Sequence, residues 1–408
     1  MSAKKDFRPD INGLRAWAVL VVVFFHFKVP GFSGGFVGVD VFFVISGYLM
    51  TSIIARFIDQ KSAQSEDIAF IGRFYLSRAK RILPALIFLC GSVLLICYLL
   101  LPSAELQTLG MHTTAALAFV SNFVFWSEAG YFDAAAHEKW LLHTWSLSVE
   151  WQFYLLYPAL LIGLSKILKR TNRLALACLF LLLCSLVASV YISAQDQAAA
   201  FYLLPTRAWE MLSGGIAFFI GDFISRRPFI SRFAYFSGLA MIAASVYLFG
   251  PGSPWPSYNA LLPVMGTFLV ILGGHQRGLL TSPAPFQVIG HWSYSIYLWH
   301  WPIAVATIYF AGDFSPAIAA WGITTSTLLG FLSYRLIENK SSGALSILNK
   351  RRAFTAISLA AVVVAVPSSL IYAGVGIKGR SSSEAEAVFA EEGNRNPSAT
   401  ERDAGSGK

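Results

Sequence analysis

The chain has 408 residues, of which 56% are hydrophobic and only 13% are charged, whereas a soluble domain carries about 25% charged residues. This composition excludes an ordinary soluble protein and predicts an all-α integral membrane protein. The net charge of +9 does not indicate nucleic-acid binding. The basic residues form short clusters between apolar segments, as the positive-inside rule predicts for a membrane protein.

Eleven segments are long and apolar enough to be transmembrane helices. Their predicted ranges are 12–28, 36–55, 82–101, 142–164, 174–193, 202–221, 233–250, 260–274, 287–310, 316–337 and 353–375. The segment 108–126 is also apolar, but counting it as a span would move every later basic cluster to the opposite side of the membrane. We therefore predict that 102–141 is an external segment that lies along the membrane or dips into it. The N-terminus is then cytoplasmic and the C-terminus external.

The first predicted span carries two ionisable residues, Arg15 and His26, eleven positions apart. This separation is close to three helical turns, so both share one face, about 16 Å apart along the axis. Asp40 is expected at the depth of His26 in the second span, where a carboxylate needs a partner. We predict that Asp40 pairs with His26 and makes it a general base. The alternatives are that Arg15 and His26 lie at the two membrane interfaces and that Asp40 caps its helix.

Two arginine-containing motifs lie near the ends of later spans. Arg78 and Arg81 are spaced i, i+3 where the third span begins, which suits a positive-inside anchor and an anionic phosphate ligand equally well. Arg207 and Glu210 have the same spacing, which favours an ion pair over a catalytic dyad.

The fourth span begins with HTWSLSVEWQFYLLYP and places four polar residues on one helical face: His143, Ser146, Glu150 and Tyr157. An acidic residue seven positions into a membrane segment is uncommon, so Glu150 is either a site residue or a structural glutamate with satisfied oxygens. His291 and His300 lie in HWSYSIYLWHWP, whose aromatic residues are typical of a membrane interface. Neither histidine is included in the predicted site.

Together these segments resemble the acyltransferase-3 family, membrane acetyltransferases that modify bacterial surface polysaccharides. The similarity covers roughly residues 6–340 and rests on Arg15-x10-His26, GVDVFFVISGY, RAKRILPA, HTWSLSVEWQFYLLYP, RAWE, SYSIYLWHWP and IEN, in family order. It implies a ten-helix core in the bacterial inner membrane, over residues 1–340, that transfers acetyl groups from cytoplasmic acetyl-CoA to a sugar hydroxyl on the periplasmic side. Residues 341–376 are expected to add a cytoplasmic loop and an eleventh helix, and 377–408 to form a disordered periplasmic tail.

The resemblance also implies roles for individual residues. His26 matches the family's first-helix histidine, the base for the acceptor hydroxyl, and Arg15 matches its paired arginine. The predicted catalytic residues are His26, Asp40, Arg15 and Glu150. The predicted acetyl-CoA site contains Arg15, Arg78 and Arg81, and the predicted substrate site contains His143, Ser146, Arg207 and Glu210. The sequence has no metal-ligand spacing, so no metal is expected.

The expected acceptor is lipopolysaccharide O-antigen, ahead of exopolysaccharide and peptidoglycan. The other expected partners are acetyl-CoA, the lipid bilayer and a periplasmic SGNH-type domain or protein. Two other function classes are consistent with the residues. A proton-coupled transporter or flippase could use Arg15, His26 and Asp40 as a relay, although the sequence shows no internal repeat. A scaffold could hold a partner with its external tail.

Overall fold

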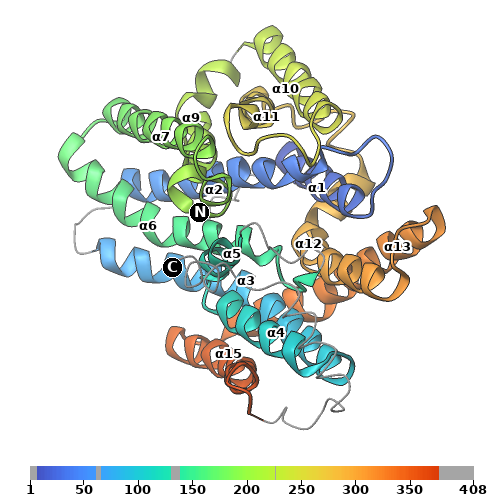
Figure 1. The fold of residues 1–408 in the computed structure, drawn as a ribbon. Coiled ribbons are helices and arrows are strands. Elements are labelled where there is room, and N and C mark those ends of the chain that lie inside the picture. Colours follow the sequence, from blue (N-terminus) through green and yellow to red (C-terminus); the bar gives the residue numbers. More distant parts are fainter. Residues whose placement is uncertain (1–6, 61–65, 130–137, 226, 376–408) are drawn as a thin grey trace, which may run out of the picture.

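The computed structural model of the chain describes residues 7–60, 66–129, 138–225 and 227–375. Within these ranges the protein contains helices and no strand, so the prediction of an all-α protein is confirmed (Figure 1). The predicted tail, 377–408, lies outside the described residues.

Each of the eleven predicted spans coincides with one helix. These helices are α1 (Pro9–His26), α2 (Gly38–Gln60), α3 (Glu66–Leu100), α6 (Thr144–Leu168), α7 (Thr171–Ser193), α9 (Leu204–Ser225), α10 (Pro228–Leu248), α11 (Leu261–Gly273), α12 (Ala284–Ala311), α13 (Pro316–Ser333) and α15 (Lys350–Tyr372). Shorter elements connect them: η1 (Gly35–Val37), α4 (Ser103–Leu117), α5 (Ser121–Glu128), α8 (Gln197–Tyr202), η3 (Tyr258–Ala260), η4 (Tyr334–Glu338) and α14 (Asn339–Ile347).

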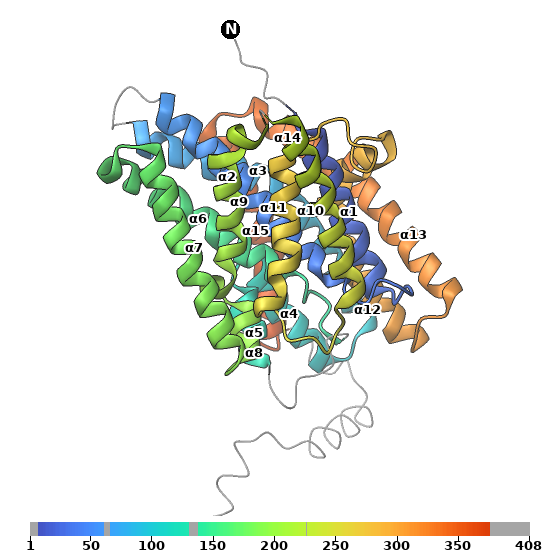
Figure 2. The same cartoon turned by 90° about the horizontal axis from the view of Figure 1, so that it is seen from above.

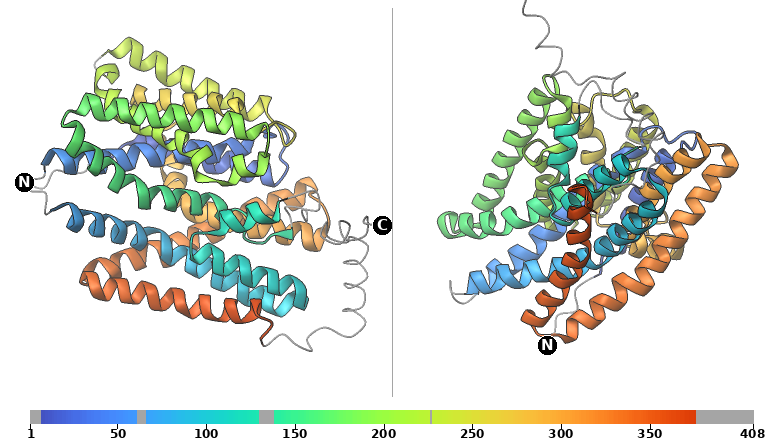
Figure 3. Two further views of the ribbon diagram at one scale, coloured as in Figure 1. Left: turned by 60° about the vertical axis from the view of Figure 1, so that its left-hand side comes forward. Right: turned by 60° about the horizontal axis from the view of Figure 1, so that its bottom comes forward.

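The long helices lie side by side and run between two opposite faces of the molecule (Figures 2 and 3). The face at which α1 begins is called the first face, and the face at which α1 ends is called the second face. The short helices α5 and α8 lie at the second face, and α14 lies at the first (Figure 2).

The outer helices expose apolar side chains, which only a lipid environment accommodates in such number. Seven helical segments of the described chain are long and apolar enough to cross a membrane. In the most apolar part of α7 only 11% of the residues are buried, and in that of α15 only 17%. Phe180 and Leu183 are among the exposed side chains of α7. The chain is a multi-pass membrane protein, while the number of its crossings stays a prediction.

Three long helices, α1, α9 and α12, are not among those seven. Their sequences carry Arg15, Arg207 and His300, which lower the mean hydropathy. α1 packs against α12 and α2, and α9 packs against α2 and α7, so protein rather than lipid surrounds much of their surface. Polar residues are tolerated there because other helices supply their partners.

The segment predicted not to form a simple span is broken into two short helices, α4 and α5. α4 packs against α3 and α15 rather than continuing into a long helix. The buried His112 of α4 lies 2.7 Å from an oxygen of Glu128 at the end of α5. This arrangement agrees with the prediction that 108–126 does not cross the membrane as one helix.

The backbones of α2 and α9 are in direct contact where the two helices cross, because each helix has a glycine at the crossing point. A Cβ atom added to Gly47 would lie 1.7 Å from the carbonyl oxygen of Met211, and one added to Gly214 would lie 1.9 Å from that of Val44. No side chain larger than hydrogen fits either position. Such small residues are what allow membrane helices to approach closely.

We therefore expect Gly47→Ala to separate α2 from α9 and to destabilise the protein by at least about 1–3 kcal/mol, the usual cost of overpacking. Thermal unfolding of detergent-purified protein measures the effect. Gly163→Ala in α6 is the matched control, because nothing lies within 4 Å of its added Cβ atom. Equal stability of the two variants would contradict the backbone contact.

Candidate active site

Five helices converge on a pocket that contains the three arginines of the predicted acetyl-CoA site. We call it the arginine pocket, and α1, α2, α3, α6 and α12 form its walls. Its polar lining residues are Arg15, Ser46, Arg78, Arg81, Ser146, Glu150, Tyr154, Ser293, Tyr294 and Tyr297. The structure therefore brings together Arg15, Arg78 and Arg81 as expected, although α3 begins at Glu66, well before the predicted span.

No carboxylate of the described chain forms an ion pair with Arg15, Arg78 or Arg81. The Nε of Arg78 is buried and has no hydrogen-bond partner among the described residues. Because clustered guanidinium groups without counterions are costly, the pocket is electrostatically suited to an anionic ligand.

Glu150 lies in the wall of this pocket, but other side chains already satisfy one of its oxygens. The hydroxyls of Ser46 on α2 and Tyr154 on α6 both donate to Glu150 Oε1. The predicted polar face of α6 is confirmed, since Ser146 also lines the pocket and Tyr157 contacts Thr51 of α2 at 2.7 Å. Glu150 thus combines the two roles considered for it, a satisfied structural carboxylate and a pocket residue.

A second cavity, of about 510 Å³, lies at the other end of α1. We call it the histidine cavity. Its polar lining residues are His26, Lys28, His143, Tyr202, Arg207, Ser253 and Tyr297, and its aromatic walls include Trp145, Trp255 and Trp301. His26 is the last residue of α1 and His143 directly precedes α6. Two histidines and a buried arginine therefore line one cavity, and a molecule bound there would contact all three.

His26 is paired differently from the prediction. Its Nδ1 lies 3.0 Å from Nε2 of His300 on α12, and its ring packs edge-on against Trp301. Asp40, expected to be the partner of His26, instead forms an ion pair of 3.2 Å with Arg207. The prediction was wrong because α9 supplies a guanidinium at that depth, and a permanent cation attracts a carboxylate more strongly than an imidazole does.

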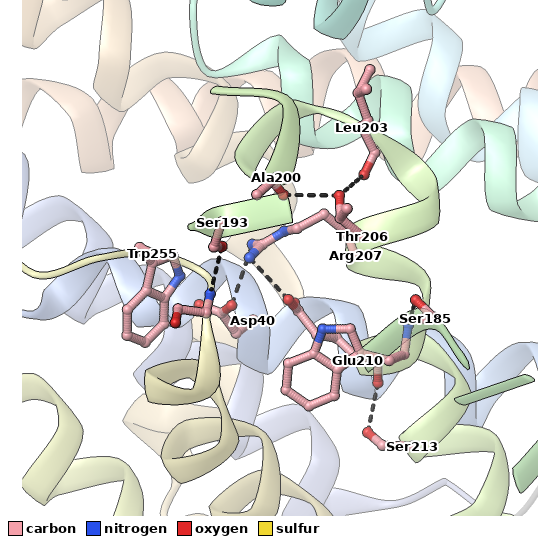
Figure 4. A network of polar contacts seen from close by, with 12 residues as sticks. Asp40, Ser185, Ser193, Ala200, Leu203, Thr206, Arg207, Glu210, Ser213 and Trp255 are labelled. Carbon is pink, nitrogen blue, oxygen red and sulfur yellow. Dashed lines mark hydrogen bonds and ion pairs between the residues drawn. The ribbon is translucent and has the colours of Figure 1, made fainter. Parts of the chain in front are cut away.

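Arg207 lies between two carboxylates, as Figure 4 shows. Besides Asp40 on α2, it pairs with Glu210 on its own helix at 2.9 Å, and all three side chains are at most 1% exposed. The predicted i, i+3 ion pair is confirmed. The guanidinium also lies 5.4 Å from the ring centre of Phe43 and 5.6 Å from that of Trp145. This network holds α2 and α9 together beside the histidine cavity, and it places Glu210 in a structural position rather than in the cavity wall.

The two cavities meet at Val39 and Tyr297, which line both of them. The Tyr297 hydroxyl lies 2.7 Å from that of Ser146 and donates to the carbonyl oxygen of His143 at 3.0 Å. The candidate substrate residues Ser146 and His143 thus hold the side chain that separates the cavities. The arginine pocket and the histidine cavity are thus neighbours along α1, with Arg15 in the wall of one and His26 in the wall of the other.

Comparison with known proteins matches the family profile described as "Acyltransferase domain" to residues 8–373. The chain belongs to the acyltransferase-3 family. A relative named "O-acetyltransferase OatA", from Staphylococcus aureus (strain MRSA252), is 30% identical over 387 residues, which cover 90% of this chain and 63% of that protein. Another, "Peptidoglycan O-acetyltransferase OatA" from Listeria monocytogenes, is 30% identical over 352 residues, with 82% of this chain and 56% of that protein covered.

The chain thus spans less than two thirds of the length of these relatives. No solved structure matches it. Its place in the family agrees with the resemblance seen in the motifs, including the one that carries His26.

Sequence reasoning missed His300, Tyr297 and Ser46 as residues of the site. His300 and Tyr297 are spaced i, i+3 on α12, a signal that both face one direction. However, His26 and His300 are 274 positions apart, and only the packing of α1 on α12 brings them together.

We expect Arg207→Leu to destabilise the protein by about 3–5 kcal/mol, because it leaves two buried carboxylates without a cation. Adding Asp40→Asn and Glu210→Gln to Arg207→Leu is expected to restore part of the stability. Arg173→Leu, at an exposed position of α7, is the matched control for thermal unfolding. If Arg207→Leu and Arg173→Leu unfold alike, the network has no structural role.

Proposed function

We propose that the chain is an O-acetyltransferase that moves an acetyl group from acetyl-CoA in the arginine pocket to a polysaccharide hydroxyl in the histidine cavity. One observation carries the proposal: an anion-binding pocket and a histidine-lined cavity adjoin at Val39 and Tyr297. Membership of the acyltransferase-3 family and the printed names of the relatives support the same reaction.

The donor site is proposed from the charge of the arginine pocket. Acetyl-CoA carries phosphate groups at one end and its thioester at the end of a long, narrow arm. Guanidinium forks of Arg15, Arg78 and Arg81 suit the phosphates, whose charge would replace the missing counterions. Arg15 and His26 are about 16 Å apart along α1, a separation that an extended arm bridges. Because acetyl-CoA is a cytoplasmic metabolite, we assign the first face to the cytoplasm and the second to the outside of a bacterial inner membrane.

The chemical step is proposed at His26. The acceptor hydroxyl oxygen forms a bond to the thioester carbonyl carbon while its proton passes to His26. The carbon–sulfur bond breaks, and the proton then moves from His26 to the sulfur, giving the acetylated sugar and the free thiol of CoA. His143, which lines the same cavity, is proposed to contact the acceptor or the thioester carbonyl.

The acceptor is proposed to be a surface glycan. The histidine cavity has a volume of about 510 Å³, aromatic walls and a few polar groups. These features are typical of a site that binds an organic ligand. The name of the Listeria relative favours peptidoglycan over the O-antigen expected from the sequence. A periplasmic SGNH-type domain or protein, expected from the resemblance, would then act next to the second face.

The test uses purified protein in nanodiscs with radiolabelled acetyl-CoA and either peptidoglycan fragments or O-antigen as acceptor. We expect His26→Ala to lower label transfer by about 10²- to 10⁴-fold, the usual contribution of a general base, and to retain CoA binding. Transfer at the wild-type rate by folded His26→Ala would remove His26 from the chemical step. Failure of the wild-type protein with both glycans would reject these acceptors.

We expect Arg78→Ala and Arg81→Ala each to weaken CoA binding by about 10- to 100-fold, because each removes charge-assisted hydrogen bonds worth about 1.5–3 kcal/mol. Equilibrium binding of labelled CoA measures this. Arg73→Ala is the matched control, since Arg73 is exposed on the same helix and does not line the pocket. A proton-coupled transporter or flippase would bind no CoA, and that outcome would favour the alternative function.

A further inference from the structure

His300 lies beside His26 although the proposed reaction gives it no part. It is fully buried on α12, whereas His26 is partly exposed in the histidine cavity. The two rings stack with their centres 5.1 Å apart. His300 does not line the cavity, so it acts on a substrate only through another residue.

The backbone determines which nitrogen of His300 carries the proton. Nδ1 of His300 lies 2.5 Å from the carbonyl oxygen of Tyr297, one turn earlier in α12. A carbonyl oxygen can only accept a hydrogen bond, so Nδ1 of His300 must be the donor. In a neutral imidazole the other nitrogen then has a free lone pair, and Nε2 of His300 is therefore an acceptor.

The same reasoning determines which ring nitrogen of His26 carries the proton. Nε2 of His300 lies 3.0 Å from Nδ1 of His26. Because Nε2 of His300 accepts, Nδ1 of His26 must donate, and the basic lone pair of the neutral His26 ring is on Nε2. A chain of two hydrogen bonds thus runs from the Tyr297 carbonyl through His300 to His26.

We propose that His300 is a positioning residue that holds His26 in its Nδ1-protonated tautomer, so that His26 Nε2 takes the proton of the acceptor hydroxyl. This inference rests on the proposed acetyl transfer. When Nε2 of His26 receives the proton, Nδ1–H still donates to His300, which stabilises the resulting imidazolium. The bond also fixes the orientation of the ring, as the hydrogen-bond partner of a functional histidine generally does.

A histidine is a suitable orienting group at this position. A carboxylate at this fully buried position would carry a charge that is costly without a paired cation. A neutral imidazole at position 300 orients the His26 ring without adding a charge. Both rings are held in place, since the α12 backbone accepts from Nδ1 of His300 and the Trp301 side chain packs against His26.

The experiment compares His300→Phe, which removes the acceptor, with His300→Gln, whose amide oxygen can still accept from His26. We expect His300→Phe to lower kcat by about 100-fold with little change in KM, and His300→Gln to recover much of the loss. His291→Phe, on the exposed surface of the same helix, is the matched control and is expected to behave like the wild type. A merely structural role would lower the amount of folded protein rather than kcat of the folded fraction.

A second measurement tests the hydrogen-bond chain without relying on turnover. Nitrogen-15 NMR of histidine-labelled protein in nanodiscs distinguishes the two tautomers, and the signals missing from His26→Gln assign His26. We expect the Nδ1-protonated form in the wild type and in His300→Gln, and loss of this preference in His300→Phe.

An Nε2-protonated His26 in the wild type, or full kcat in folded His300→Phe, would overturn the positioning role. If His26→Ala also retained transfer, the proposed function of His26 would fail independently of the tautomer.

Discussion

The interaction on which the arrangement of this site depends is the buried contact of one guanidinium, Arg207, with two carboxylates. Asp40 and Glu210 cannot both be neutralised by a single cation, so the network is held by the surrounding packing as much as by its own attraction. That packing is the crossing of α2 and α9, where Gly47 and Gly214 bring the two backbones into contact. The position of α2 in turn places Val39 between the two cavities.

The same network explains how His26 obtains its partner. Because Asp40 is bound to Arg207, it does not orient the imidazole of His26, and α12 provides His300 instead. The polar groups at the second face therefore form two separate units. One is a charged network that holds α2 to α9. The other is the pair of histidines, His26 and His300, between α1 and α12.

In the arginine pocket, by contrast, the charged groups are not paired with one another. Arg15, Arg78 and Arg81 have no paired carboxylate among the described residues, and two hydroxyls already satisfy one oxygen of Glu150. An internal counterion would stabilise the arginines but would compete with an anionic ligand. Their unpaired state makes sense if the ligand supplies the negative charge, which is the basis for placing acetyl-CoA there.

The sequence by itself determined the membrane class, the helical segments and most polar residues of the site, because these depend on composition and on local spacing. Arg15 with His26, Arg207 with Glu210, and the polar face of α6 are each read from positions along one helix. Only the tertiary structure decided the partners between helices. The pairing of Asp40 with Arg207 and of His26 with His300 depends on how α2 packs on α9 and α1 on α12. Periodicity shows which side of a helix is polar, but not which other helix that side meets.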